Sequence, residues 1–241
     1  MSFTKLNVLV LSILLLFSLF AGVVSAQEED EEATTQITLG DNLKATGIVG
    51  VFLALLSIAM VAFTIEHFIN VQRTKIIPPE IIQELEVFFE EEDYEGALQF
   101  CESNPGFVTN ILAASLPRMS QGFEAMKETA QEIGEEEAVN LQIKVSFLSL
   151  SAGLGPMLGL FGTVWGMIAA FNKLASMKGS ANAAQLASGI SMALMTTLLG
   201  LLIAMPSLLF YYFFKNRVTK IILEAGVVVS EFVDRFRPVE E

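Results

Sequence analysis

The sequence predicts an all-α integral membrane protein, in which a signal peptide is followed by three long transmembrane helices and a cytoplasmic helical domain. Long uncharged segments predict the helices: one lies between Lys144 and Lys173, and another covers residues 179–214. Each is longer than the roughly 20 residues that cross a bilayer as a helix. Charged residues make up only 17% of the chain, and the mean hydropathy is +0.57. Both values are atypical of a soluble domain.

The N-terminal segment has the pattern of a secretory signal peptide over residues 1–26. Lys5 precedes an apolar run, which ends in a small-x-small sequence at Ala26. We expect cleavage after Ala26, and an uncleaved signal anchor is the alternative because the apolar run is long for a signal peptide. Residues 27–44 are acidic and polar, and they predict a short periplasmic tail.

The first membrane helix of the mature chain is predicted over residues 45–68. The segment from Ala45 to Ile65 carries no charge and is long enough to cross a bilayer. His67, the only histidine of the chain, follows Glu66 at the end of this segment. A proton relay at His67 is conceivable, but its position at the end of the span favours an interfacial residue.

Residues 69–143 predict a cytoplasmic helical domain. Residues 78–80, Pro-Pro-Glu, open a helix because proline is tolerated and glutamate is favoured in a first turn. The helical spacing of apolar residues continues through 94–101 and is broken by Asn-Pro-Gly at 104–106. Further helices are predicted over 107–119 and 124–141, and the last is expected to continue into the second span.

Charge and composition exclude several classes of function. The net charge of −13 argues against nucleic acid as a partner, because a phosphate backbone requires basic patches. The acidic runs at 90–93 and 135–137 are best interpreted as solvated helix faces and not as metal ligands. A single cysteine and a single histidine leave no metal centre and no catalytic pair within one chain. We therefore expect no enzyme activity, no metal and no cofactor.

The second span is predicted over 144–172, a periplasmic loop over 173–185, the third span over 186–214, and a cytoplasmic C-terminal helix over 215–241. Small residues recur every three or four positions in both spans, so they form one stripe on each helix. Such stripes let helices approach closely in lipid. The residues expected in helix packing are Gly155, Gly159, Gly162, Gly166, Gly189, Ala193, Gly200, Ala204 and Pro206.

The two long spans contain hydroxyls but no ionisable carboxylate, amine, guanidinium or imidazole. A membrane proton carrier normally needs such a group, so this chain can only line a path while a partner helix brings the carboxylate. Thr163, Thr197 and Thr196 are the candidates for lining it. The alternative for each threonine is a hydrogen bond to its own helix carbonyl four residues back. Because Thr196 and Thr197 are adjacent, only one is expected to point along the stripe.

The distribution of lysine and arginine predicts the orientation. Arg73, Lys75, Lys144, Lys215, Arg217 and Lys220 fall on one side of the predicted spans, and only Lys44, Lys173 and Lys178 fall on the other. The side richer in basic residues is expected to be cytoplasmic. This orientation leaves the mature N-terminus in the periplasm and the C-terminus in the cytoplasm, as a signal peptide also implies.

Two motifs resemble a known family. Residues 159–166, GLFGTVWG, closely resemble the second-span signature of the MotA/TolQ/ExbB proton channel family, on its ExbB/TolQ side. Residues 189–201, GISMALMTTLLGL, followed by Ala-Met-Pro at 204–206, resemble its third-span signature. The order of elements is also similar over about residues 45–215: one span, a cytoplasmic helical segment, and two long spans.

The resemblance implies a homo-pentamer in the bacterial inner membrane that encloses two copies of an ExbD/TolR-like single-span partner. An intramembrane Asp of the partner would carry protons past Thr163 and Thr197. The proton motive force would then drive TonB- or Tol-type work at the outer membrane, in biopolymer or protein transport, with a TonB- or TolA-like protein as a further partner.

One position departs from the family pattern. Many ExbB and TolQ proteins carry Glu five residues before the third-span threonine, where this chain has Met192. Two alternative functions therefore stay open. The first is a flagellar-type stator subunit, against which stand the signal peptide, the single span before the polar domain and the small size of that domain. The second is a non-conducting membrane scaffold, which Met192 favours. The choice between H⁺ and Na⁺ also stays open.

Overall fold

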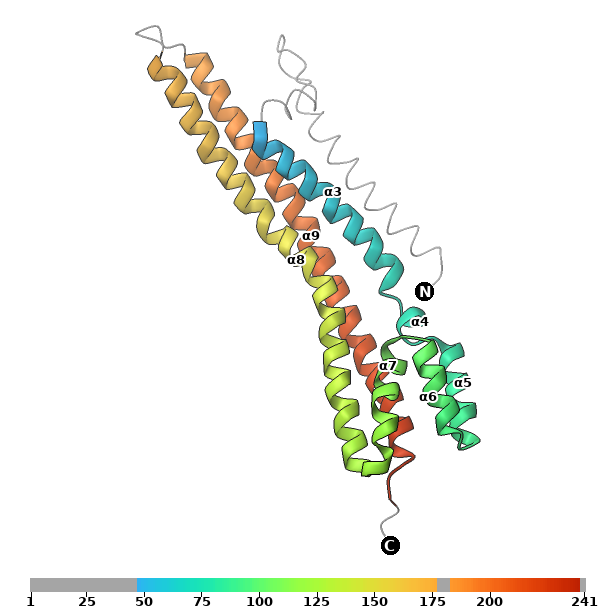
Figure 1. Cartoon of the computed structure of the whole chain (residues 1–241). Coiled ribbons are helices and arrows are strands. Elements are labelled where there is room, and N and C mark those ends of the chain that lie inside the picture. The colour runs from blue at the N-terminus through green and yellow to red at the C-terminus, as the bar shows by residue number, and fades with distance from the viewer. Residues whose placement is uncertain (1–46, 177–182, 239–241) are drawn as a thin grey trace. The chain divides into compact units, whose positions relative to one another are not determined.

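The computed structural model describes residues 47–176 and 183–238, and all regular structure in these residues is helical (Figure 1). The predicted signal peptide, the whole predicted tail, the first two residues of the predicted first span and the centre of the predicted loop 173–185 lie outside the described residues. The helices are α3 (Gly47–Asn70), α4 (Arg73–Ile76), α5 (Pro79–Glu90), α6 (Tyr94–Ser103), α7 (Phe107–Ser115), the 3₁₀ helix η1 (Leu116–Gln121), α8 (Phe123–Ser176) and α9 (Ala183–Asp234).

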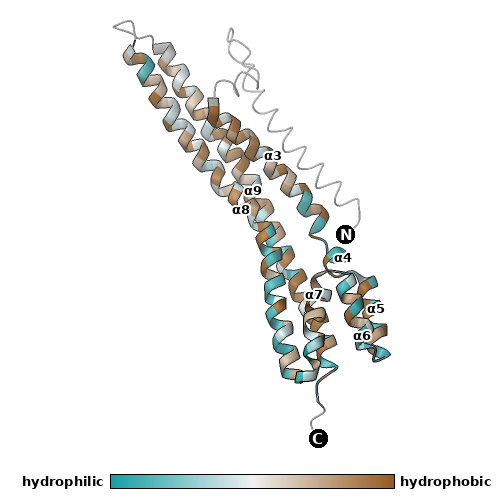
Figure 2. Ribbon diagram, viewed as in Figure 1, coloured by the Kyte–Doolittle hydropathy of each residue, from teal (hydrophilic) through white to brown (hydrophobic). Residues whose placement is uncertain are grey.

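Within the described residues, three helices, α3, α8 and α9, are long and apolar enough to cross a membrane. Figure 2 shows that α8 begins as a hydrophilic helix and becomes hydrophobic in its second part, whereas α3 is hydrophobic over most of its length. Both α8 and α9 pack against α3 and against each other. The apolar end of α3 contacts α9 through Val49, Leu53 and Ile203.

The two longest helices continue without interruption from the apolar spans into the polar domain. α8 has 54 residues, so it is about 80 Å long at 1.5 Å per residue. α9 has 52 residues and continues through Lys215 to Asp234. The segment predicted as a C-terminal helix from residue 215 is thus helical to Asp234, as a direct continuation of the third span within α9. At Lys215 the sequence changes from uncharged to charged, but no proline or glycine there interrupts the backbone hydrogen bonds of α9.

The polar domain is built from short helices whose ends follow local chemistry. α5 begins at Pro79, with Glu80 in its first turn, as predicted. Asp93 caps α6 by accepting a hydrogen bond from the backbone N–H of Gly96 at 2.9 Å. Glu92 lies between the two helices with φ +56°, so the helical pattern does not run continuously from α5 into α6.

The helix predicted over 107–119 is shorter in the structure. α7 ends at Ser115, and the chain then forms η1, which contains Pro117 near its start. Proline lacks the N–H that an α-helix would use. Gly122 follows with φ +105°, a conformation that favours glycine and turns the chain into α8.

One hydrophobic core joins the polar domain to the neighbouring ends of the long helices. The largest fully buried side chains of this core come from four helices, α5, α7, α8 and α9: Leu85, Ile111, Leu112, Met126, Leu148 and Phe214. A domain of this size buries little surface on its own. The shared core explains how the short helices are held, because α8 and α9 supply the wall against which they pack.

Burial makes Cys101 a reporter of folding. The side chain is 1% exposed, and burial, with a smaller contribution from the charge of Glu102, raises the pKa of the thiol to about 11 from 9.0. Below pH 9 this shift lowers the reactive thiolate fraction about 100-fold. We therefore expect a maleimide to label the folded chain at least about 100-fold more slowly than the chain unfolded in dodecyl sulfate. The mass of the intact protein, measured over time, gives both labelling rates. Equal rates would show that Cys101 is not in a closed core.

Candidate functional site

The contact between α8 and α9 is made by small residues along its length. A Cβ added at Gly155 would lie 2.7 Å from the carbonyl oxygen of Gly200, and one added at Gly166 would lie 2.9 Å from the Cβ of Ala193. Such distances leave no room for a larger side chain. As residue numbers rise along α8, those of their neighbours fall along α9, so the two helices are antiparallel, as seen in Figure 1.

The residues predicted for helix packing meet in this contact. The glycine and alanine positions pair as follows: Gly155 with Gly200 and Ala204, Gly162 with Thr196, Gly166 with Ala193, and Gly189 with Ala170. Pro206 is the exception among the predicted packing residues. It lies inside α9, half-buried, and its ring removes one backbone donor from the helix.

Three threonine hydroxyls gather at the middle of the α8–α9 contact. The Oγ1 atoms of Thr163 and Thr197 are 2.6 Å apart, and either can be the donor. The carbonyl oxygen of Gly159 lies within hydrogen-bond distance of all three hydroxyls, at 2.9 Å from Thr163 and 3.1 Å from both Thr196 and Thr197. The cluster is enclosed: Thr163 is 7% exposed and Thr196 is 3% exposed, whereas Thr197 is half-buried.

Gly159 makes this convergence possible. A Cβ there would lie 2.9 Å from the Cα of Thr197 and 3.0 Å from the carbonyl oxygen of Thr196, so the backbone of α8 lies directly over the two adjacent threonines. Both hydroxyls therefore reach α8, and the expectation that only one could point along the stripe is wrong. The sequence predicted Gly159 for packing alone, and no sequence pattern marks its carbonyl as the shared acceptor.

The threonine pair has two equivalent hydrogen-bonding arrangements. In one, Thr163 donates to Thr197, which donates to the carbonyl of Gly159. In the other, Thr197 donates to Thr163, which donates to the same carbonyl. Each hydroxyl has one hydrogen, so both arrangements use both hydrogens. The pair can thus reverse its direction without losing a hydrogen bond.

Thr196 differs from the other two threonines. Its hydroxyl donates to the carbonyl of Ala193 at 2.7 Å, which is shorter than its 3.1 Å approach to Gly159. A bond to a carbonyl of the same helix is the usual partner of a threonine inside a helix. Thr196 therefore lies beside the threonine pair, but its one hydrogen is directed to the backbone.

The positions around the cluster add no charge to it. The described spans 145–172 and 186–214 contain no Asp, Glu, Lys, Arg or His. Met192, where the family resemblance leads one to expect Glu, is 39% exposed on the surface of α9. The site can therefore orient hydrogen bonds, and within these two spans it has no carboxylate, amine, guanidinium or imidazole beside it.

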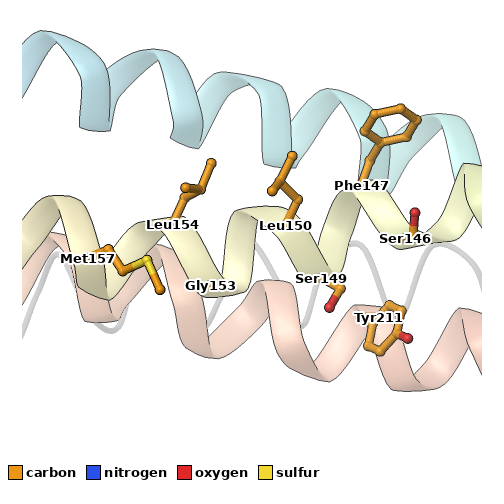
Figure 3. A pocket seen from close by; sticks show the side chains of 8 residues that line it. All are labelled: Ser146, Phe147, Ser149, Leu150, Gly153, Leu154, Met157 and Tyr211. Atoms are coloured by element: carbon orange, nitrogen blue, oxygen red, sulfur yellow. The ribbon is translucent and has the colours of Figure 1, made fainter.

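A hollow of about 510 Å³ lies further along α8, nearer the polar domain (Figure 3). Figure 3 shows Phe147, Leu150 and Leu154 on the side of the hollow toward α3, and Tyr211 on α9. The lining includes Ser146, Ser149, Gly153 and Met157, and none of the three clustered threonines. The hollow is thus a separate surface feature and contributes no group to the threonine site.

Comparison with known proteins agrees with this architecture. The family model described as the MotA/TolQ/ExbB proton channel family matches residues 105–225, which include the polar helices from α7, all of α8 and most of α9. The chain belongs to this family. The match contains the whole α8–α9 contact and all three clustered threonines.

Relatives within the family include both TolQ and ExbB proteins. The Tol-Pal system protein TolQ of Haemophilus influenzae is 38% identical over 96 residues, which cover 40% of this chain and 42% of that protein. The biopolymer transport protein ExbB of Salmonella typhimurium is 27% identical over 140 residues, which cover 52% and 57%. A solved structure, that of C. jejuni MotAB, has a TM-score of 0.49 and 16% identity, and the match covers 95% of this chain and 94% of that one. The chain thus matches between about two fifths and three fifths of the length of these curated relatives.

Proposed function

We propose that this member of the proton channel family is an ExbB/TolQ-like stator subunit. It would line a proton path in the bacterial inner membrane and use the proton motive force to drive TonB- or Tol-type work at the outer membrane. The observation that carries the proposal is the part-buried pair Thr163–Thr197, whose hydroxyls are 2.6 Å apart between two uncharged spans. A pair that can reverse its hydrogen bonds is suited to pass a proton without holding a charge.

The proposal requires a partner that brings a carboxylate. In both arrangements of the pair the hydroxyl hydrogens are already donated, so the oxygen of Thr163 or Thr197 is left free to accept. An acceptor suits a protonated carboxyl group, which donates a hydrogen bond. We infer that an ExbD/TolR-like single-span protein supplies an intramembrane Asp, and that five copies of this chain surround it. A TonB- or TolA-like protein is the proposed further partner.

The proposed orientation follows from the basic residues near the spans. With the polar domain and the C-terminus in the cytoplasm, Arg73, Lys144 and Lys215 lie on the cytoplasmic side. The loop between α8 and α9 and the N-terminal tail are then periplasmic. In this arrangement the threonine pair lies about 19 residues, or about 28 Å of helix, from Lys144.

Composition of the assembled complex and its proton flux test the proposal. The chain would be expressed with its genomic neighbours, purified in detergent and weighed by native mass spectrometry. We expect five copies of this chain with two copies of a single-span protein that has an intramembrane Asp. The same complex, reconstituted in vesicles, should take up protons when a potential is applied, and an Asp→Asn variant of the partner should not.

Each alternative predicts a different result from the same preparation. A flagellar-type stator would give the same stoichiometry with a partner whose external domain binds the cell wall and with cells whose motility depends on it. A scaffold would give five copies without a partner, or a complex whose proton uptake equals that of empty vesicles. Either of these two scaffold results contradicts the proposed function.

A further inference from the structure

His67 joins the three long helices at the end of the apolar spans nearest the polar domain. The imidazole is buried, with 4% of the residue exposed, near the end of α3. Its Nδ1 atom lies 2.6 Å from the carbonyl oxygen of Phe63 in the same helix, and its Nε2 atom lies 2.9 Å from the carbonyl oxygen of Lys144 in α8. The ring of Phe214 in α9 lies 5.5 Å from it, between centroids.

Both partners of the imidazole are acceptors, and this restricts its protonation. A neutral imidazole has one N–H donor and one bare nitrogen, whereas an imidazolium has two donors. With either neutral tautomer, one bare nitrogen would face the lone pairs of a carbonyl oxygen at 2.6 or 2.9 Å. Only the imidazolium forms both hydrogen bonds.

Solvent can reach this joint through a cavity of about 360 Å³. The groups that border the cavity come from α3, α4, α7, α8 and the segments between them, and α9 contributes none. The charged groups in its lining are Glu66, Lys75, Glu137 and Lys144, and the neutral Asn110 donates to Glu137 at 2.7 Å. The cavity lining thus contains two acidic and two basic side chains, so its formal charges balance.

We propose that His67 is a pH-sensitive joint that binds α3 to α8 as an imidazolium and releases α8 when it loses a proton. The shorter hydrogen bond, to Phe63, lies within α3 and is retained by the neutral tautomer with hydrogen on Nδ1. The proton therefore leaves Nε2, and the interhelical bond to Lys144 is lost. A drop in pH on this side would close the joint, and a rise would open it.

Nitrogen NMR of the single histidine tests the protonation directly. Because His67 is the only histidine, the full chain labelled with ¹⁵N-histidine, purified through a histidine-free affinity tag, gives the signals of one ring. We expect two protonated nitrogens at about pH 5.5 and one bare nitrogen, assigned to Nε2, at about pH 8. One bare nitrogen at both values overturns the proposal, as does a bare Nδ1 at the higher pH.

Thermal unfolding tests whether the titration loosens the fold. Loss of one hydrogen bond of about 1 kcal/mol should lower the unfolding temperature of the native chain by about 2–4 °C between the same two pH values. In His67→Gln, whose amide does not titrate, that difference should disappear. Gln72→Ala is the matched control, since it removes a 3.0 Å bond to the carbonyl of Phe68 near the same helix end without touching α8; it should keep the pH dependence. An unchanged pH dependence in His67→Gln would contradict the proposal.

Discussion

Thr163→Val and Thr197→Val are each expected to reduce proton flux strongly and leave the assembled complex intact. Valine has the shape of threonine without the hydroxyl, so the small-residue contact between α8 and α9 is preserved. Each substitution removes one member of the only hydroxyl–hydroxyl bond in the cluster, at 2.6 Å, and with it the reversible arrangement. We expect flux in vesicles to fall by about 100-fold, the low end of what a positioned proton-transfer group contributes. The thermal stability should change by no more than about 1 kcal/mol.

Two other threonines provide controls for this experiment. Thr64 in α3 is buried and donates to the carbonyl of Met60 at 2.7 Å, so Thr64→Val removes the same kind of bond away from the α8–α9 contact. Thr196→Val removes the hydroxyl that is directed to Ala193. Both variants should keep most of the flux. Flux that survives in Thr163→Val, or falls equally in Thr64→Val, would remove the threonine pair from the proton path.

Gly159→Ala is expected to disrupt the α8–α9 contact and the site together. The added Cβ would lie 2.9 Å from the Cα of Thr197 and 3.0 Å from the carbonyl oxygen of Thr196, and neither backbone atom can move without displacing the helix. Overpacking of this kind costs about 1–3 kcal/mol, or a fall of about 2–12 °C in the unfolding temperature for a chain of this size. Because the helices would separate at the carbonyl that both threonines share, flux should also be lost.

A glycine two turns earlier on the same helix is the matched control. At Gly153 an added Cβ meets nothing within 4 Å. Gly153→Ala makes the same chemical change and should leave stability unchanged or raise it by up to about 1 kcal/mol, because alanine is the better helix former. Thermal unfolding of both variants in the same detergent measures the difference. Equal effects at the two positions would show that the α8–α9 contact is looser than the structure has it.

The sequence predicted the features that depend on repeating patterns of side chains. It did not predict which backbone groups those side chains contact. Uncharged runs and small-residue spacing predicted the long helices, because burial in lipid constrains every residue of a span. The stripes also include Thr163 and Thr197, and therefore predicted these two as candidate site residues. The carbonyl of Gly159 and its three hydroxyl neighbours depend on how closely two helices approach, which no single stripe determines.

Errors in the prediction occurred where the backbone changes direction. The helix assigned to 107–119 was too long because the pattern of apolar residues continues past Ser115, while Pro117 and Gly122 determine the backbone. His67 was predicted as an interfacial residue at the end of the first span; what the prediction missed is that its side chain is buried and reaches Lys144, 77 residues away. Its partner there is a main-chain oxygen, which every residue has, so the sequence carried no signal of the contact.

Because α8 is one helix, it connects the threonine pair directly to the polar domain. From Thr163 to Phe123 the helix extends over about 60 Å and includes Pro156, which removes one backbone hydrogen-bond donor from it. A tilt of about 5° about Thr163 would move the Phe123 end by about 5 Å, roughly the pitch of one helical turn. A small displacement at the threonine pair would therefore become a larger displacement at the polar domain. In the opposite direction, a displacement of that domain would become a smaller one within the membrane.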